Sequence, residues 1–428
     1  MSIDFPKNWK QVVLEDALDA LIDYRGKTPK KVDKGIPLIT AKVVKSGRIL
    51  PMDEFIADED YESWMVRGIP QISDIVVTTE APLGEVAQIK NANVALAQRI
   101  VTLRGKVDFL ENDFLLFLMQ SDFVQNQLEA RATGSTVKGI KQSELRKIIL
   151  PIPPIVEQKC IGKILSDLDD KIHLNNQINQ TLESIAQAIF KSWFIDFDPV
   201  RAKITAKREG KDTELAAMCV ISGKSQEELK QMSKDDFAEL QASAALFPDE
   251  LVETELGEVP KGWDKYSLSK MITLIGGGTP KRSEPNYWNG DIFWFSVKDV
   301  PNEGEVFVIT TQEKISELGL NKSSTKLLPV GTTIITARGT VGKIALVGYE
   351  MAMNQSCYGV QGINGVRQFM TYYLIKNAVE VLKKNTHGAV FDTITQSTFD
   401  TVTSIKPSIE MMDLFESKVE KIMGHIKN

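Results

Sequence analysis

The stretch on which the rest of the chain depends runs from Ile155 to Ile189 and reads IVEQKCIGKILSDLDDKIHLNNQINQTLESIAQAI. Apolar residues recur in it at seven-residue intervals, with Asn175 in the remaining slot; they are Ile161, Leu168, Leu182 and Ile189. A stripe with this spacing predicts one long helix that needs a partner helix. At about 1.5 Å per residue the helix would be roughly 50 Å long.

Two interpretations of this helix compete: a rod between domains and a buried core helix. Its middle is polar, since Asn175, Asn176, Gln177, Asn179 and Gln180 lie close together there. A core helix would be apolar on most sides. The composition therefore favours the rod.

The length, composition and cysteine content of the chain exclude several classes of protein. With 428 residues, 43% of them apolar and 25% charged, the chain has the composition of an ordinary globular protein with two or three domains. No apolar run reaches the roughly 18 residues of a membrane span, and the N-terminus lacks a signal pattern, so we expect a cytoplasmic protein without a membrane partner. Three separated cysteines, Cys160, Cys219 and Cys357, argue against a disulfide framework or a zinc site.

The sequence before the long helix returns after it as an internal repeat. Pairs of identical residues stand 254 positions apart at both ends of the repeated segment: Trp9 and Trp263, Gly134 and Gly388, Pro153 and Pro407. A shared offset over about 150 residues indicates duplication of one structural unit. In the first copy we expect a strand from Ile36 to Val44 and a hairpin over 74–89, then a helix from Phe114 to Ala130.

The second copy also runs into a helix, whose apolar residues are spaced by three and four. We therefore expect the two long helices to pair as an antiparallel coiled coil. The predicted pairing residues are Ile161, Leu168, Asn175, Leu182 and Ile189 with Met412, Phe415, Val419, Ile422 and Ile426. The second helix is shorter, about 30 Å at most. Asn175 either fixes the register of the pair or is a solvated polar break.

The predicted fold class is α+β, with two repeated α/β domains separated by long helices. The expected segments are a first domain (1–153), a central helix (154–195), a connector (196–256), a second domain (257–407) and a terminal helix (408–428). The connector has helical patches and is polar enough to be a mobile linker.

A search for catalytic motifs finds none. The segment Gly339 to Ile344 lacks the first glycine and the Ser or Thr of a phosphate-binding loop. The run Gly276–Gly278 predicts a tight turn, because it lacks the spacing of a dinucleotide fingerprint. His173, His387 and His425 have no set of metal ligands around them. We therefore expect no catalytic residue, no metal and no cofactor in this chain.

The remaining candidates for a functional role are basic and polar residues in corresponding loops of the two copies. The candidate DNA-binding residues are Arg25, Lys27, Thr28, Lys30, Lys42, Lys45, Thr136 and Lys138 in the first copy, and Lys281, Arg282, Lys298, Arg338 and Lys343 in the second. Such side chains neutralise phosphates, and Arg also hydrogen-bonds guanine. The basic residues of the first copy's loops also include Lys31, Lys34 and Arg48. An ordinary solvated, lysine-rich face is the competing interpretation. The net charge of −6 requires that any DNA site be local or supported by a partner.

The chain resembles the specificity subunit of Type I restriction-modification enzymes along almost its whole length. The resemblance rests on the segments 153–158 (PPIVEQ), 193–200 (WFIDFDPV), 247–249 (FPD), 255–263 (ELGEVPKGW) and 278–280 (GTP), in this order along the chain. It implies that each repeat is a target recognition domain that reads one half of a split, asymmetric DNA sequence. It also implies that the paired helices set the unread gap between the half-sites.

The resemblance further implies partners. Two modification subunits would methylate adenine with S-adenosylmethionine, and ATP-dependent, Mg-requiring restriction subunits would join the complex with double-stranded DNA. The sequence departs from the family pattern in its terminal helix, which is much shorter than the central one. The alternative function is a non-catalytic scaffold that holds partner subunits without reading DNA.

Overall fold

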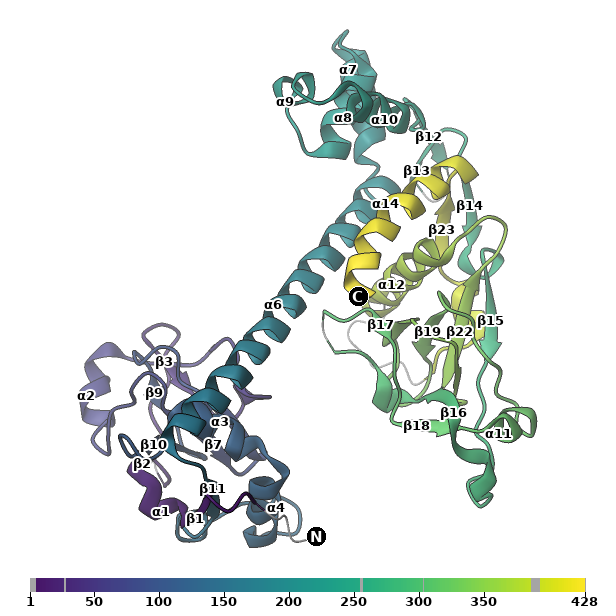
Figure 1. Cartoon of the computed structure of the whole chain (residues 1–428). Coiled ribbons are helices and arrows are strands. Elements are labelled where there is room, and N and C mark those ends of the chain that lie inside the picture. The colour runs from purple at the N-terminus through teal and green to yellow at the C-terminus, as the bar shows by residue number, and fades with distance from the viewer. Residues whose placement is uncertain (1–4, 27, 255–256, 303, 386–392, 428) are drawn as a thin grey trace. The chain divides into compact units, whose positions relative to one another are not determined.

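A computed structural model describes residues 5–26, 28–254, 257–302, 304–385 and 393–427 (Figure 1). Its contacts divide the chain into two compact units, Met1–His173 and Leu174–Asn428. Helix α6 (Ile155–Phe194) contributes its first half to unit 1 and its second half to unit 2. No helix of the described residues is both long and apolar enough to cross a membrane.

Unit 1 is built on a four-stranded antiparallel sheet. In spatial order its strands are β2 (Leu18–Asp23), β10 (Ile100–Gly105), β7 (Ile75–Thr79) and β8 (Leu83–Gln88). Side chains alternate across this sheet: Ile75 and Val77 of β7 face one buried cluster, and Val76 faces another. Because both faces are covered, the first three residues of the strand, Ile75 to Val77, form an apolar run instead of alternating with polar residues.

The two faces of this sheet are covered by different layers. One carries α3 (Asn112–Gln120) and α4 (Asp122–Arg131), and the other carries a small sheet of β6 (Phe55–Ile56), β3 (Ile36–Ile39) and β9 (Ala95–Leu96). The minor elements are β1 (Lys10–Val13), α1 (Leu14–Ala17), β4 (Val44–Lys45), β5 (Arg48–Ile49), η1 (Asp58–Asp60), α2 (Tyr61–Trp64), α5 (Gln142–Leu145) and β11 (Ile149–Ile152). The hairpin over 74–89 is confirmed as β7 and β8. The strand predicted from Ile36 to Val44 is wrong in length: β3 ends at Ile39, and turns follow until β4.

Unit 2 repeats this topology and adds one parallel strand to the edge of the main sheet. Its main sheet has the order β15 (Ile272–Gly276), β22 (Cys357–Gly362), β19 (Thr333–Thr336), β20 (Ile344–Val347) and β17 (Phe307–Val308). A second sheet joins β18 (Glu313–Ile315), β16 (Trp288–Phe295) and β21 (Met351–Met353), and helix α12 (Gln368–Asn385) covers the main sheet. The other elements are β14 (Asp264–Ser267), η2 (Leu268–Lys270), η3 (Pro285–Tyr287), η4 (Val297–Asp299), α11 (Glu317–Asn321), α13 (Gln396–Asp400), β23 (Thr403–Lys406) and α14 (Ile409–Lys427).

The strand register confirms the duplication. In unit 1, β1 pairs with β11 so that Lys10 lies opposite Ile152. In unit 2, β14 pairs with β23 so that Asp264 lies opposite Lys406, and both positions are shifted by 254. The predicted repeat is therefore one of structure as well as of sequence.

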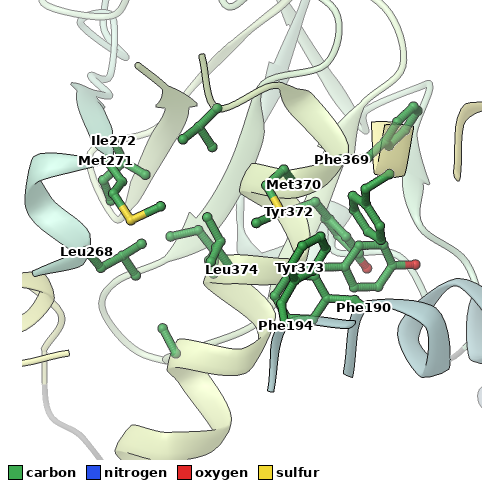
Figure 2. Close-up of a cluster of buried hydrophobic side chains, with 14 of the residues drawn as sticks. Phe190, Phe194, Leu268, Met271, Ile272, Phe369, Met370, Tyr372, Tyr373 and Leu374 are labelled. Atoms are coloured by element: carbon green, nitrogen blue, oxygen red, sulfur yellow. The ribbon is translucent and has the colours of Figure 1, made fainter. Parts of the chain in front are cut away.

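The terminal helix α14 packs on the C-terminal part of α6 within unit 2. Phe415 of α14 is fully buried, and its ring lies 5.8 Å from Phe190, 6.2 Å from Trp193 and 5.2 Å from Phe194 of α6. Tyr373 of α12 stacks on Phe190 at 5.6 Å in the same cluster (Figure 2). At its other end α14 lines a hollow through Ile426 together with Asn176, which precedes Phe190 in α6. The two helices are therefore antiparallel.

The seven-residue pattern overestimates the length of this pairing. Leu182 and Ile189 pack on the unit 2 core with Met412, Phe415, Val419, Ile422 and Ile426. In contrast, Ile161 packs in unit 1, Leu168 is 53% exposed, and Asn175 is exposed as a solvated polar break. The prediction is wrong for these three residues, because α14 has 19 residues and reaches only the last part of the 40-residue α6.

The connector has more structure than a mobile linker. It forms α7 (Asp198–Arg208), α8 (Thr213–Ser222), α9 (Gln226–Lys230) and α10 (Lys234–Ala245), followed by a hairpin of β12 (Leu251–Thr254) and β13 (Gly257–Pro260). A small core with Met218, Leu229 and Leu240 holds α8, α9 and α10 together. The Lys203 ammonium donates to the Phe247 carbonyl oxygen at 2.8 Å, which ties α7 to the end of the segment.

Each long helix also caps a helix of the domain that precedes it. In unit 1 the Gln158 side-chain oxygen of α6 accepts from the Glu111 N–H at 2.9 Å, just before α3. In unit 2 the Glu416 carboxylate of α14 accepts from the Phe369 and Met370 N–H groups of α12 at 3.1 and 3.2 Å. These contacts satisfy donors that a helix start leaves unpaired.

Burial of Glu416 is expected to make the stability of unit 2 depend on pH. Burial raises the pKa of this carboxyl, and the two N–H groups oppose the shift only in part. A folded-state pKa above the unfolded value stabilises the fold at low pH, and the effect is lost as pH rises from about 4.3 through the folded pKa. Glu416→Gln, which imitates the protonated form, should therefore gain stability relative to the parent between pH 4 and pH 7 in urea denaturation. Parallel pH profiles of the two proteins would contradict this prediction.

Candidate nucleic-acid interface

Three loops of unit 1 meet at one end of the four-stranded sheet. They are residues 24–26 and 28–31 after β2, the turn 80–82 between β7 and β8, and the loop 133–140, and we name them the first loop cluster. The Ile140 N–H donates to the Thr79 carbonyl oxygen at 2.9 Å, and a β-bridge joins Glu80 to Gly139. These contacts attach the third loop to the sheet end.

Arg25 connects the first and third of these loops instead of pointing freely to solvent. Its guanidinium donates to the Asp23 carboxylate at 2.9 Å and to the Ile140 carbonyl oxygen at 2.8 Å. Its Nη2 atom is buried and has no hydrogen-bond partner within the described residues. Arg25 therefore holds the first and third loops together, and its contact with DNA stays a prediction.

The other candidates of unit 1 are distributed unevenly. Thr28, Lys30 and Thr136 are exposed in the first loop cluster, and Lys138 pairs with Glu129. Lys42 pairs with Asp53 at 2.9 Å, and Lys45 lies on the β4–β5 hairpin, which contacts α6 through Arg48 and Asp169. The structure thus does not bring Lys42 and Lys45 into the loop cluster. The prediction for Lys27 lies outside the described residues.

Unit 2 has a second loop cluster at the corresponding end of its main sheet. It consists of the segment 277–282 after β15, the turn 337–343 between β19 and β20, residues 354–356, and residues 393–394. The Ala337 N–H donates to the Ser356 carbonyl oxygen at 2.7 Å, and a β-bridge joins Arg338 to Thr393, as Glu80 is joined to Gly139 in unit 1. Corresponding contacts therefore attach these loops to the sheet end in both units.

The tight turn predicted at Gly276–Gly278 is wrong: Gly276 ends strand β15, and Gly277 and Gly278 follow it without a turn. The last two glycines are required for a steric reason instead. A Cβ atom on Gly277 would lie 2.0 Å from the Asn354 carbonyl oxygen, and one on Gly278 would lie 2.3 Å from the Ser324 hydroxyl. Only glycine allows the backbone to approach neighbouring loops so closely. The glycine run thus holds segment 277–282 against residues 354–356.

The candidates of unit 2 are all exposed, with different partners. Lys281 pairs with Glu284 at 3.1 Å, and Arg282 pairs with Glu313. Arg338 and Lys343 lie in the second loop cluster and make no ion pair with described residues. Lys298 lies on η4 and, after Arg282, helps to lower the pKa of Glu313 electrostatically. The side-chain hydrogen bond to Glu313 raises the pKa of Arg282.

Sequence reasoning missed several residues near the clusters. Arg67 donates to the carbonyl oxygens of Asp23 and Arg25 at 2.9 Å, and Arg99 pairs with Glu80 at 2.9 Å. Trp288 and Trp294 lie beside Arg282 in unit 2. None of these stands at a matched position of the repeat, so the comparison of the two copies could not find them.

Exposed cations and hydroxyl groups surround both clusters, and such groups contact phosphates and base edges. Among the described residues no group of three or more His, Cys, Asp or Glu side chains could hold a metal ion.

One family model matches most of the chain. It describes the "Type I restriction modification DNA specificity domain" and matches residues 6–184 and 260–410. The second matched segment corresponds to the second copy of the repeat, and the first covers the first copy and continues into α6 as far as residue 184.

Similar proteins have related names. The chain is 33% identical over 346 residues, covering 77% of this chain and 75% of the relative, to the Type I restriction enzyme HindI specificity subunit of Haemophilus influenzae. It is 31% identical over 163 residues, 38% of each chain, to the MjaIX specificity subunit of Methanocaldococcus jannaschii. A solved Type I restriction-modification S subunit from M. genitalium aligns with 100% of this chain and 94% of its own length, at 13% identity and a TM-score of 0.49.

Proposed function

The chain belongs to the family of Type I restriction modification DNA specificity domains, and on this premise we propose that each unit reads one half of a bipartite DNA target. It is a DNA-recognition subunit without a catalytic role of its own. Its first domain would read one half-site with the first loop cluster, and its second domain would read the other half-site with the second.

The observation that carries this proposal is the match between the two loop clusters. In each unit the loops lie at the corresponding end of the main sheet, and a corresponding β-bridge joins two of them. Exposed cations lie there in each: Lys30 in unit 1, and Arg338 and Lys343 in unit 2. Two linked sites on one molecule multiply specificity, because the second contact becomes intramolecular. Since the loops differ in sequence, the two half-sites would differ as well.

Helix α6 would set the spacing between the half-sites and hold the partners. Apolar side chains that the single chain leaves exposed follow this helix: Ile164, Leu168, Ile172, Ile178 and Ile185. Exposed apolar side chains in such a row favour a protein partner. We propose that two modification subunits dock here, with S-adenosylmethionine, ATP and Mg bound by the modification and restriction subunits in the cytoplasm.

Selection from a randomised duplex library tests the proposed function. The full-length chain with its modification subunits should enrich a motif of two specified segments separated by an unspecified gap. Absence of any enriched motif would favour the alternative, a scaffold that holds partner subunits without reading DNA.

Neutralising the exposed cations should weaken DNA binding. Lys30→Gln with Lys138→Gln tests the first cluster, and Arg338→Gln with Lys343→Gln tests the second. Each lost phosphate contact should reduce the slope of log affinity against log salt by about 0.9. Lys224→Gln with Lys230→Gln, in the connector, removes the same charge elsewhere and serves as the control. Equal losses in the control would show that only net charge matters.

A further inference from the structure

The side chain of Arg282 is held in one orientation beside the second loop cluster. Its guanidinium carbon lies 3.8 Å from the centre of the Trp288 ring system, so the planar group rests on this ring. Nη1 and Nη2 donate to the two carboxylate oxygens of Glu313, the second at 2.9 Å. More than half of the Arg282 side chain is still exposed. The two donors therefore form a preset fork at the surface of the protein.

The ring beneath Arg282 is itself fixed. Trp288 packs edge-on against Trp294 with 5.2 Å between ring centres, and its Nε1 donates to the Lys281 carbonyl oxygen at 3.3 Å. Trp294 is buried and donates to the Gly278 carbonyl oxygen at 3.0 Å. The Trp288 ring, which is the platform for Arg282, is thus anchored to segment 277–282, the first part of the second loop cluster.

Unit 1 has a different cation at the corresponding place. The sequence Thr-Pro-Lys occurs in both copies, and it is followed by Lys31 in the first and by Arg282 in the second. Lys31 pairs with Glu54 at 2.8 Å, immediately before β6, and Arg282 pairs with Glu313 at the start of β18, the equivalent strand. In the described residues no aromatic ring lies beneath Lys31. The duplicated ion pair has acquired a fork and a platform in unit 2 alone.

We propose that Arg282 is a specificity-determining residue, which reads a guanine in the half-site of unit 2 through two hydrogen bonds to O6 and N7. The assignment rests on the proposed function. The guanine edge offers two acceptors in one plane, as the Glu313 carboxylate does in the free protein. Glu313 is 43% exposed and returns to water when DNA replaces it.

The fixed plane favours a base over a phosphate as the partner. A phosphate accepts hydrogen bonds from many directions, and the flexible ammonium of Lys31 suffices for it. The acceptors of a base edge lie in one plane. A guanidinium whose orientation is already restricted binds them more tightly, because less side-chain entropy is then lost on binding. Trp288 is a positioning residue in this scheme.

Arg282→Lys provides the test, since it keeps the charge and removes the fork. The full-length chain and its modification subunits are used to select from a randomised duplex library, and base preferences are scored at each position. We expect the preference for one guanine in the second half-site to fall about ten- to a hundredfold. Preferences in the first half-site should stay unchanged, which also shows that the variant is folded. Lys31→Arg is the matched exchange and should leave the second half-site unaltered.

Trp288 adds a second, independent readout. Trp288→Ala should reduce the same guanine preference, and Trp288→Phe should restore most of it, because a ring is again present under the guanidinium. Unchanged base preferences in Arg282→Lys, or a uniform loss of affinity at all sequences, would overturn the assignment. A parent protein without base preferences in either half-site would instead refute the proposed function.

Discussion

Insertion of seven helix-forming residues between Leu174 and Asn175 of α6 is expected to lengthen the unread gap of the DNA target by about three base pairs. Seven residues extend a helix by about 10 Å, and each base pair occupies about 3.4 Å along DNA. Seven residues are also close to two full turns, so the helix after the insertion keeps its rotation about the axis to within about 20°. Mapping the methylated adenines in cells that carry the variant measures the gap directly.

The structure shows where such an insertion disturbs least. Residues of α6 up to His173 line a hollow of unit 1, and residues from Asn176 onward line a hollow of unit 2. Leu174 and Asn175 are exposed and fall between the two groups. An equal insertion between Gly223 and Lys224, in the connector, is the control and should leave the gap unchanged. A target with the original spacing in the α6 variant would refute the proposal that this helix sets the distance.

Phe415→Ala is expected to destabilise unit 2 by about 3–5 kcal/mol. Phe415 is fully buried, and its ring contacts Phe190, Trp193, Phe194 and Tyr373 at centre distances of 5.2 to 6.2 Å. Truncation would leave a cavity among rings that cannot collapse into it and would remove favourable edge-to-face pairs. Urea denaturation followed by hydrogen exchange measures the loss in each unit separately.

Unit 1 supplies the internal reference for this experiment. Its cores contain no residue of α14, so its protection against hydrogen exchange should not change in Phe415→Ala. Leu168→Ala is the matched control, because the seven-residue pattern placed Leu168 in the same helix interface. In the isolated chain it should change stability by no more than about 0.5 kcal/mol, since this side chain is exposed. A large effect of Leu168→Ala would show that the predicted coiled coil extends further than the structure indicates.

The fold was predictable to the extent that it depends on local and repeated signals. The apolar spacing identified α6, which spans Ile155–Phe194 against the expected 154–195. The constant offset of 254 identified the repeat, and the register of β1 with β11 and of β14 with β23 reproduces that offset. Such signals can be recognised in the sequence, because every residue that carries them belongs to one continuous element or to its duplicate.

The candidate binding residues were predictable as loop residues, but their contacts were not. Arg25 was singled out as a basic loop residue, yet its hydrogen bond to the Ile140 carbonyl oxygen makes it a tie between loops. Arg282 was singled out on the same grounds, but its platform comes from Trp288, six residues later, and its partner Glu313 lies 31 residues away. No spacing rule connects a side chain with partners that only the sheet brings near.

The sequence by itself therefore determined the two repeated domains, the long helix between them and the loops that carry the exposed cations. Tertiary structure alone decided how far the long helices pair, which cations are free, and which one is held flat on a ring. The physical reason is that periodicity reports which face of an element is apolar, whereas pairing depends on what reaches that face. Leu168 and Leu182 have the same place in the pattern, and only Leu182 lies within reach of the core that contains α14.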